Sequence, residues 1–296
     1  MNEKIIEFLL LQIQLTQLRK INTYYRGDNL DNIFKRFGIE NDGSEYNKRV
    51  LLERIFLIGD KSKYFYNDIL FKDKTFSRDL ALVDTSEAAL KKIFDRLNSS
   101  TKSKKEYIQK YFKNNSALNE FFKNKSNKIG FTNSIIKSEN PLAYRNYYLK
   151  ILHQLYFIGY RNNSHFVSSS DDMGITKNFA GSNGIIIHCW NPNFYFYRKK
   201  FEINNLPKQE SLAFKEQREF SFLAGILPHF ISAVEFTEKK EIYFNPTILK
   251  SEINKNLFFE GLDIDQTDFI EIVSKTEFRK YFNRRGLIYS EHNASR

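Results

Sequence analysis

The segment FKEQREFSF, residues 214–222, places Glu219 where an apolar stretch begins. The residues that follow, FSFLAGIL, are typical of a buried strand. One interpretation of Glu219 is a charge at a strand edge that prevents the strand from pairing with another chain. In the other interpretation, a carboxylate at the head of a rigid strand stabilises positive charge on a sugar during cleavage of a glycosidic bond. Glu219 is therefore a candidate catalytic residue.

Two other segments carry polar side chains on predicted strands. TYYRG, residues 23–27, predicts a short strand that Gly27 ends, and Arg26 offers the fork of donors that a pyrophosphate requires. FVSSSD, residues 166–171, places three serine hydroxyls at the end of another strand. Taken alone, Arg26 is also explained by a surface turn, and the serines by a Ser-rich strand end. The order of the three segments along the chain favours a shared site.

This order resembles the Arg–Ser–Glu class of ADP-ribosyltransferases. That family carries a strand-borne Arg, then an aromatic-x-Ser-Thr-Ser strand, then a loop of the form aromatic-x-x-(Gln or Glu)-x-Glu. The third segment fits this form at Phe214, Gln217 and Glu219. The second departs from it at Ser169, which stands where the family usually has Thr and which keeps the hydroxyl.

The resemblance implies a toxin-like enzyme that uses NAD as a substrate and needs no metal. Glu219 would stabilise the oxocarbenium-like ribose as nicotinamide departs. Gln217 would orient the acceptor, and Phe214 would form the aromatic edge of the acceptor-recognition turn. The implied residues are, for catalysis, Glu219, Gln217 and Ser168; for NAD binding, Arg26, Ser168, Ser169, Ser170 and Phe179; and for acceptor binding, Phe214 and Gln217.

Two other arginines are alternatives to Arg26. Arg161 lies only a few residues before Ser168, which leaves too little chain for two separate strands. Arg145 lies within a run of helical periodicity. Arg26 is therefore preferred, and a helical insertion over residues 30–155 must separate its strand from the serine strand.

The acceptor is predicted from Gln217 and from the charge of the chain. In the family, Gln at this position accompanies asparagine of small GTPases or guanine of DNA as acceptor, whereas Glu accompanies arginine. Glu216, next to Gln217, keeps an arginine acceptor open. An amide can pair with a carboxamide or with a base edge.

The net charge of +11 lies almost entirely in the N-terminal half. Residues 1–160 hold 28 Lys and Arg against 18 Asp and Glu, and residues 101–150 hold 11 against 3. Such a field attracts polyanions, although a solvated helix surface in a proteome rich in Lys, Asn and Ile is the other interpretation. We therefore expect RNA or single-stranded DNA as acceptor. The alternatives are a protein acceptor and a non-catalytic nucleic-acid-binding or partner-binding protein.

Other chemistries find no support in the sequence. Cys189 is the only cysteine, which excludes an internal disulfide and a Cys-based zinc site. The chain has no P-loop and no G-x-G-x-x-G motif, and its serines form no G-x-S-x-G elbow. The five histidines show no metal-binding spacing; they are His153, His165, His188, His229 and His292. We expect a cytoplasmic protein without a membrane span. We also expect its activity to be neutralised by an antitoxin or limited by tight conditional control.

Periodicity predicts an α+β fold with an ADP-ribosyltransferase-like split β-sheet core and a helical N-terminal insertion. Residues 1–155 would form a mostly helical basic lobe that carries the first core strand, 23–27, and residues 156–296 a β-rich catalytic core, together making one compact unit. The resemblance covers 20–30 and 155–250. Helices are predicted over 3–21, 45–58, 86–97, two parts of 104–124 broken near 114–116, 140–159 and 265–282. Further strands are predicted over 165–169, 184–190, 194–203, 219–226, 241–249 and 257–264.

Overall fold

The structure is a computed structural model of the whole chain. It describes residues 21–60, 85–155, 166–192, 206–213, 217–223, 225–226, 228–246 and 289–290. The helices predicted over 3–21 and 265–282, and the strands predicted over 194–203 and 257–264, lie outside these residues, apart from Ile21. Phe214 and Arg161 also lie outside them.

The chain divides into two compact units, where one was expected. The sheet unit comprises residues 1–72, 167–197 and 218–291, and the helical unit comprises residues 73–166, 198–217 and 292–296. The expected boundary at residue 155 separated a helical half from a β-rich half. In the structure, the first strand and the two helices after it belong with the later strands, because they pair with and cover the sheet.

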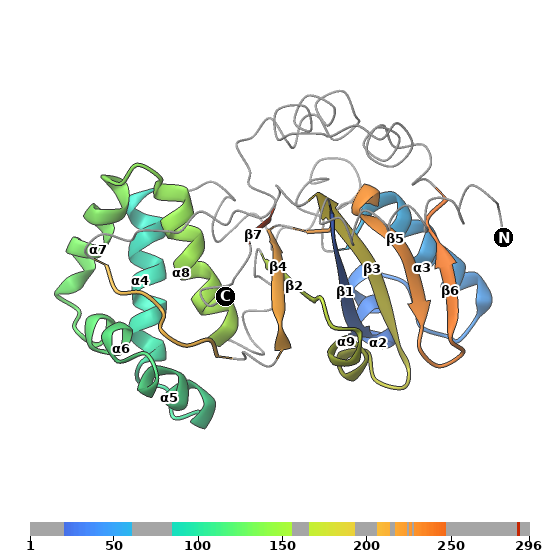
Figure 1. The fold of residues 1–296 in the computed structure, drawn as a ribbon, viewed down its shortest axis with the longest axis horizontal. Helices are drawn as coiled ribbons and strands as arrows, with labels where there is room; N and C mark the ends of the chain where they lie inside the picture. Colours follow the sequence, from blue (N-terminus) through green and yellow to red (C-terminus); the bar gives the residue numbers. More distant parts are fainter. Residues whose placement is uncertain are drawn as a thin grey trace. The chain divides into compact units, whose positions relative to one another are not determined.

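The sheet unit contains one antiparallel sheet with helices beside it, which makes the described chain an α+β protein (Figure 1). Its strands follow the order β6-β5-β3-β1-β2-β4-β7. Their bounds are β1 Ile21–Asn29, β2 Phe166–Ser170, β3 Gly184–Pro192, β4 Glu219–Leu223, β5 Ile231–Phe236, β6 Glu241–Phe244 and β7 Tyr289–Ser290. The prediction that a strand begins at Glu219 is confirmed.

Strand β1 pairs with its two neighbours, β3 and β2, over very different lengths. It pairs with β3 over nine residue pairs, from Ile21–Pro192 to Asn29–Gly184. With β2 it pairs, among the described residues, at Tyr25–Ser170 alone. The sheet is therefore continuous from β6 to β1 and narrowly joined between β1 and β2.

Alternation of side chains along β1 defines two faces of the sheet. Face A carries Tyr24, Arg26 and Asp28, and face B carries Tyr25 and Gly27. Helices α2 (Leu30–Phe37) and α3 (Glu45–Ile58) contact face A, since Arg36 of α2 pairs with Asp28 and Lys48 of α3 lies over the Phe236 ring. The predicted bounds of α3, 45–58, are confirmed.

Helix α9, Met173–Ala180, lies against face B at Gly27. A Cβ atom at Gly27 would lie 2.2 Å from the carbonyl oxygen of Thr176 and 2.9 Å from the amide nitrogen of Ala180. The prediction that Gly27 ends the first strand is wrong, because β1 continues to Asn29. The glycine is there because a side chain would collide with the backbone of α9.

The helical unit is built around an aromatic core. The rings of Phe122 and Phe131 lie 5.6 Å apart between centroids, and those of Phe131 and Tyr148 4.9 Å apart. The helices are α4 Glu87–Ser100, α5 Glu106–Lys113, α6 Ser116–Lys123, α7 Asn127–Ile136 and α8 Pro141–Leu155. Ser86 caps α4, and the predicted break near 114–116 separates α5 from α6. Nowhere in the described residues does a helix combine the length and apolarity that a membrane span requires.

Candidate active site

The three segments singled out from the sequence lie on three neighbouring strands. Arg26 is on β1, the serines are on β2, and Glu219 opens β4, with β2 between the other two. The chain separates Arg26 from Ser168 by 142 positions, yet an Nη1 nitrogen of Arg26 donates a hydrogen bond to the Ser168 carbonyl oxygen at 2.8 Å. Strand pairing therefore brings together residues that are remote in sequence.

Glu219 projects from face B. The residue after it, Phe220, packs its ring against Tyr24 at 4.7 Å between centroids, and Phe222 contacts the same ring at 6.0 Å. Since Tyr24 lies on face A, alternation places Glu219 and Ser221 on face B. The Ser221 hydroxyl donates a hydrogen bond to the Glu219 carboxylate at 3.0 Å, which fixes the direction of the carboxylate.

Two of the three serines share face B with Glu219. Ser170 is directly opposite Tyr25, a face B residue, and Ser168 lies two positions before Ser170. Ser169 therefore lies on face A, and its hydroxyl donates a hydrogen bond to the carbonyl oxygen of Phe220 at 3.1 Å. This bond ties β2 to β4. A serine suffices there in place of threonine, because the bond needs only the hydroxyl.

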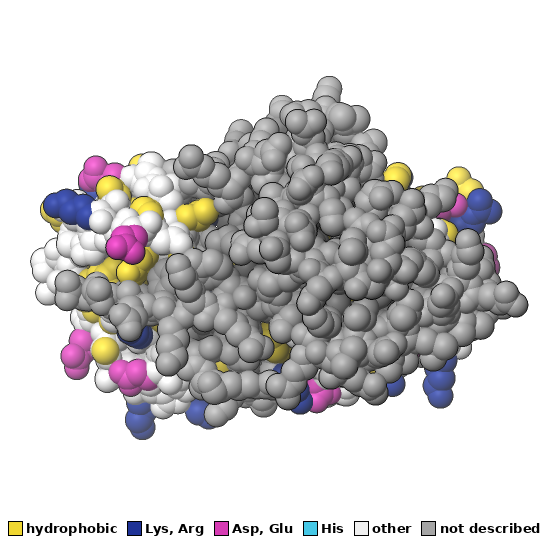
Figure 2. All heavy atoms as spheres, turned by 45° about the horizontal axis from the view of Figure 1, so that its top comes forward, with side chains coloured by type: hydrophobic (Ala, Val, Ile, Leu, Met, Phe, Trp, Pro, Cys, Tyr) yellow, Lys and Arg dark blue, Asp and Glu magenta, His cyan; other side chains and the backbone are white. Residues whose placement is uncertain are grey.

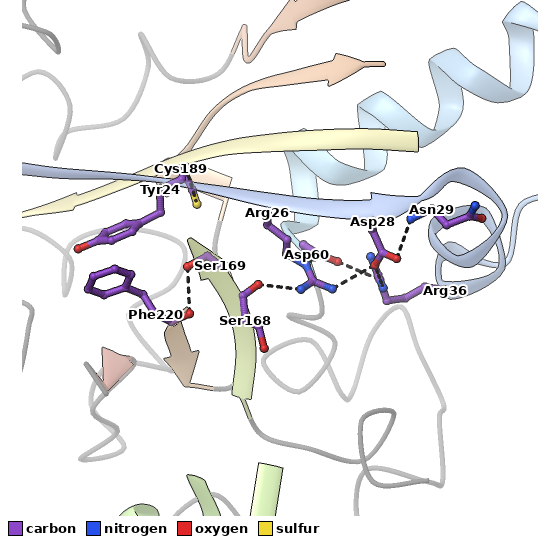
Figure 3. A network of polar contacts seen from close by, with 10 residues as sticks. All are labelled: Tyr24, Arg26, Asp28, Asn29, Arg36, Asp60, Ser168, Ser169, Cys189 and Phe220. Atoms are coloured by element: carbon purple, nitrogen blue, oxygen red, sulfur yellow. Dashed lines mark hydrogen bonds and ion pairs between the residues drawn. The ribbon is translucent and has the colours of Figure 1, made fainter. Parts of the chain in front are cut away.

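Arg26 lies on face A and is surrounded by partners (Figure 3). Besides the Ser168 carbonyl, its guanidinium donates to Asp60 at 2.6 Å and to Asp28 at 3.1 Å. Only 8% of the residue is exposed. Burial lowers the pKa of this guanidinium, but the charges of Asp60 and Asp28 outweigh burial and raise the pKa above its usual value.

Arg36 completes a network of two positive and two negative side chains. It pairs with Asp28 at 2.7 Å and with Asp60 at 2.9 Å, as Arg26 does with the same two carboxylates (Figure 3). Asp60 is fully buried. The two positive and two negative charges balance within the network. Arg26 holds β1 to β2 through the Ser168 carbonyl oxygen, and it also holds β1 to Asp60. This arrangement differs from the expectation that its donors face a pyrophosphate.

The remaining expected residues are placed as follows. Gln217 is half-buried and lies immediately before Arg218. Phe179 is 43% exposed, on α9. Of the alternative arginines, Arg145 is fully buried in α8 and donates a hydrogen bond to Asn146 at 2.8 Å. It is therefore a core residue of the helical unit.

Face B also carries a row of residues that the sequence did not single out. The ring of His188, on β3, lies 5.3 Å from that of Tyr25. Its Nε2 atom lies 3.3 Å from a Glu235 carboxylate oxygen on β5. Burial lowers the pKa of His188, against the opposing effect of Glu235. Strand alternation alone could have placed His188 and Glu235 together, once the pairing of β3 with β5 was known.

Face B thus offers a carboxylate with a fixed direction, two serine hydroxyls, an aromatic ring and an imidazole. Among the described residues, no group of three or more His, Cys, Asp or Glu side chains is arranged to hold a metal ion. Comparison with protein-family models, with curated proteins and with solved structures finds no match to this chain. The class is therefore defined by structure alone: an α+β protein with a polar site on one face of an antiparallel sheet.

Proposed function

We propose that this protein is a toxin-like ADP-ribosyltransferase that transfers ADP-ribose from NAD to a nucleobase. The observation that carries the proposal is the position of Glu219 at the head of β4, on the same sheet face as Ser168 and Ser170 of the neighbouring strand. This arrangement follows the order of the Arg–Ser–Glu family. The narrow join between β1 and β2 supports an ADP-ribosyltransferase-like split core.

Cleavage of the bond between ribose and nicotinamide requires a negative charge held in a fixed position. As the bond between ribose and nicotinamide breaks, its electron pair leaves with nicotinamide and the ribose becomes cationic. A nucleophilic atom of the acceptor then forms the new bond at the same carbon and releases its proton to the solvent. Glu219, directed by Ser221, stabilises the cationic ribose electrostatically.

Arg26 has a supporting role in this proposal. A pyrophosphate contact would compete with Asp28 and Asp60 for the guanidinium of Arg26, a residue that is only 8% exposed, and Asp60 is fully buried. Releasing such a carboxylate is costly, because it leaves a buried charge with one arginine partner, Arg36, in place of two. We therefore assign Arg26 to the join between β1 and β2 that presents the serines.

The acceptor is assigned to nucleic acid on the charge of the helical unit. Four exposed lysines, here named the lysine surface, lie on α5 and immediately before it: Lys104, Lys105, Lys110 and Lys113. They lie away from the buried side of α5, which Ile108, Tyr111 and Phe112 form. Figure 2 shows one face of the molecule, on which Lys and Arg side chains stand at separate places beside Asp and Glu. A phosphate backbone is a partner that several exposed lysines on one helix suit, because each can neutralise a phosphate.

The test is transfer from NAD labelled in its adenine ribose, incubated separately with RNA, single-stranded DNA and lysate proteins. We expect label in a nucleic-acid pool and release of nicotinamide. Glu219→Gln keeps the shape of the side chain and removes the charge, so it should lower kcat on the order of 10²–10³-fold.

Glu238→Gln is the matched control, because Glu238 is exposed in the turn before β6 of the same unit. It should transfer label at the wild-type rate. Label found only in protein would replace the acceptor with the protein alternative. Absence of both transfer and nicotinamide release from the folded wild-type protein would contradict the proposal and leave a non-catalytic role.

A further inference from the structure

Arg218 and Asp171 form a two-bond ion pair immediately before Glu219. Arg218 Nε lies 2.7 Å from Asp171 Oδ1, and Nη2 lies 2.7 Å from Oδ2. This is the fork geometry in which a planar guanidinium holds a carboxylate in one orientation. The pair joins the residue before β4 to the residue after β2, and those are the two strands that carry Glu219 and the serines.

The Asp171 end of the pair is itself rigid. Asp172 caps α9 by accepting hydrogen bonds from the amides of Gly174 at 2.8 Å and Ile175 at 3.1 Å. The Ser170 hydroxyl accepts a hydrogen bond from the Asp172 amide at 3.1 Å. The three consecutive residues Ser170, Asp171 and Asp172 are therefore anchored, and Arg218 is bound to the middle one.

The Arg218 end holds an unusual backbone conformation. Its φ is +44°, in the left-handed region that residues other than glycine seldom occupy. Such a conformation persists where surrounding contacts hold it, and it is found at functional sites. Here the turn at Arg218 sets the direction in which β4 begins, and Glu219 is the first residue of that strand.

We propose that the Arg218–Asp171 pair positions the Glu219 carboxylate relative to the Ser168 and Ser170 hydroxyls. This inference rests on the proposed function. Arg218 is a positioning residue, since it acts through the backbone of Glu219. Arg218 is half-exposed, with 46% of its side chain accessible, and exposed pairs contribute little to global stability. Its effect should therefore appear in catalysis and in local order near β4.

The kinetic test compares Arg218→Gln, Asp171→Asn and the double variant with the wild type. We expect kcat for transfer to fall about 10- to 100-fold in each single variant with KM for NAD unchanged, because misplacement of a catalytic group reduces rate. The double variant should be no slower than the singles, since either change alone breaks the pair. Arg49→Gln is the control, as the exposed Arg49 pairs with the exposed Glu53 at 2.9 Å on α3.

Arg218→Gly separates the ion pair from the backbone conformation. Glycine adopts positive φ without strain, so this variant keeps the turn and loses the pair. We expect it to be folded, with kcat reduced as in Arg218→Gln. Wild-type kcat in Arg218→Gly, or additive losses in the double variant, would overturn the positioning role.

A second measurement does not depend on activity. Hydrogen exchange of the amides of residues 218–223 should be faster in Arg218→Gln and Asp171→Asn than in the wild type and in Arg49→Gln. Unchanged exchange would overturn the inference. Lack of NAD turnover in the wild type would contradict the proposed function instead, and the exchange measurement would still decide whether the pair orders the start of β4.

Discussion

At the scale of single residues, Arg26 shows how burial decides a role that the residue type leaves open. A guanidinium is suited both to bind a pyrophosphate and to hold carboxylates within a fold. Asp28, Asp60 and the Ser168 carbonyl accept hydrogen bonds from all three nitrogen atoms of Arg26, and Arg36 shares the two carboxylates. The balanced network makes Arg26 a structural centre of the sheet unit.

Replacement of Arg26 by Gln should destabilise the protein strongly. The change leaves fully buried Asp60 with Arg36 as its remaining arginine partner, and breaking a buried pair costs about 3–5 kcal/mol. Denaturant unfolding followed by circular dichroism measures this loss. Arg49→Gln, at a highly exposed arginine, should stay within about 0.5 kcal/mol of the wild type.

Arg26→Lys distinguishes support of the fold from contact with NAD. Lysine keeps the charge but cannot reach three partners at once. If Arg26→Lys is as stable as the wild type and raises KM for NAD, Arg26 binds the substrate and the assignment made above is wrong.

At the scale of elements, the close approach of α9 to β1 fixes the turn that follows the serine strand. The helix lies so near the sheet that Gly27 and Gly184 both stand against its backbone. At Gly184, a Cβ atom would lie 2.0 Å from the Ala180 carbonyl oxygen. Gly27 and Gly184 therefore allow α9 to lie close to the sheet, directly after the short chain that carries Asp171 and Asp172.

Gly27→Ala should destabilise the sheet unit by about 3 kcal/mol, because its methyl group would overlap backbone atoms that cannot turn aside. Gly130→Ala is a control for which the opposite change in stability is expected. Gly130 lies inside α7 with open space around it, so alanine should stabilise that helix by up to about 1 kcal/mol. Thermal unfolding of both variants measures the difference. Equal stability of the two would contradict the packing of α9 on β1.

At the scale of the whole molecule, the helices that lengthen the interval between Arg26 and the serines also carry most of the excess charge. Residues 101–150 hold 11 basic side chains, of which Arg145 and Lys150 are buried and Lys128 pairs with Asp95. The lysine surface is among the exposed remainder. Under the proposed function, the helical unit would serve acceptor binding and the sheet unit the transfer chemistry.

Replacing the four residues of the lysine surface by Gln should weaken binding to single-stranded RNA or DNA and flatten its dependence on salt. Each lost phosphate contact should reduce the slope of log K against log salt by about 0.7. The control replaces four exposed lysines of the sheet unit: Lys35, Lys177, Lys239 and Lys240. Equal losses of affinity in the two variants would show that the contribution is net charge alone.

Sequence patterns predict much of the local structure. They do not predict which residues share a face of the sheet. Periodicity predicts α3 and the start of β4 correctly, because both are amphipathic or apolar segments with clear boundaries. Helices α2, α7 and α9 are not predicted, since they are short or rich in Asn, Ser and Gly, and β5 is also missed.

Within the candidate site, the sequence brings together Glu219 and the serines but not Asp60. No local signal connects Asp60, two residues after α3, to Arg26 on β1, because the contact depends on tertiary packing alone. The placement of Ser169 and Arg26 on the face opposite Glu219 likewise depends on the register of β1 with β2, which the sequence does not specify.

Trp190, the chain's single tryptophan, is fully buried in the sheet unit, where its indole lies 5.4 Å from the Phe230 ring. Tryptophan fluorescence therefore originates from the sheet unit. The five helices described in the helical unit do not contribute to it. Two units need not melt together. Emission would consequently report unfolding of the sheet unit, whereas ellipticity reports both units. Transitions that do not coincide on the same sample would therefore show that the two units unfold separately.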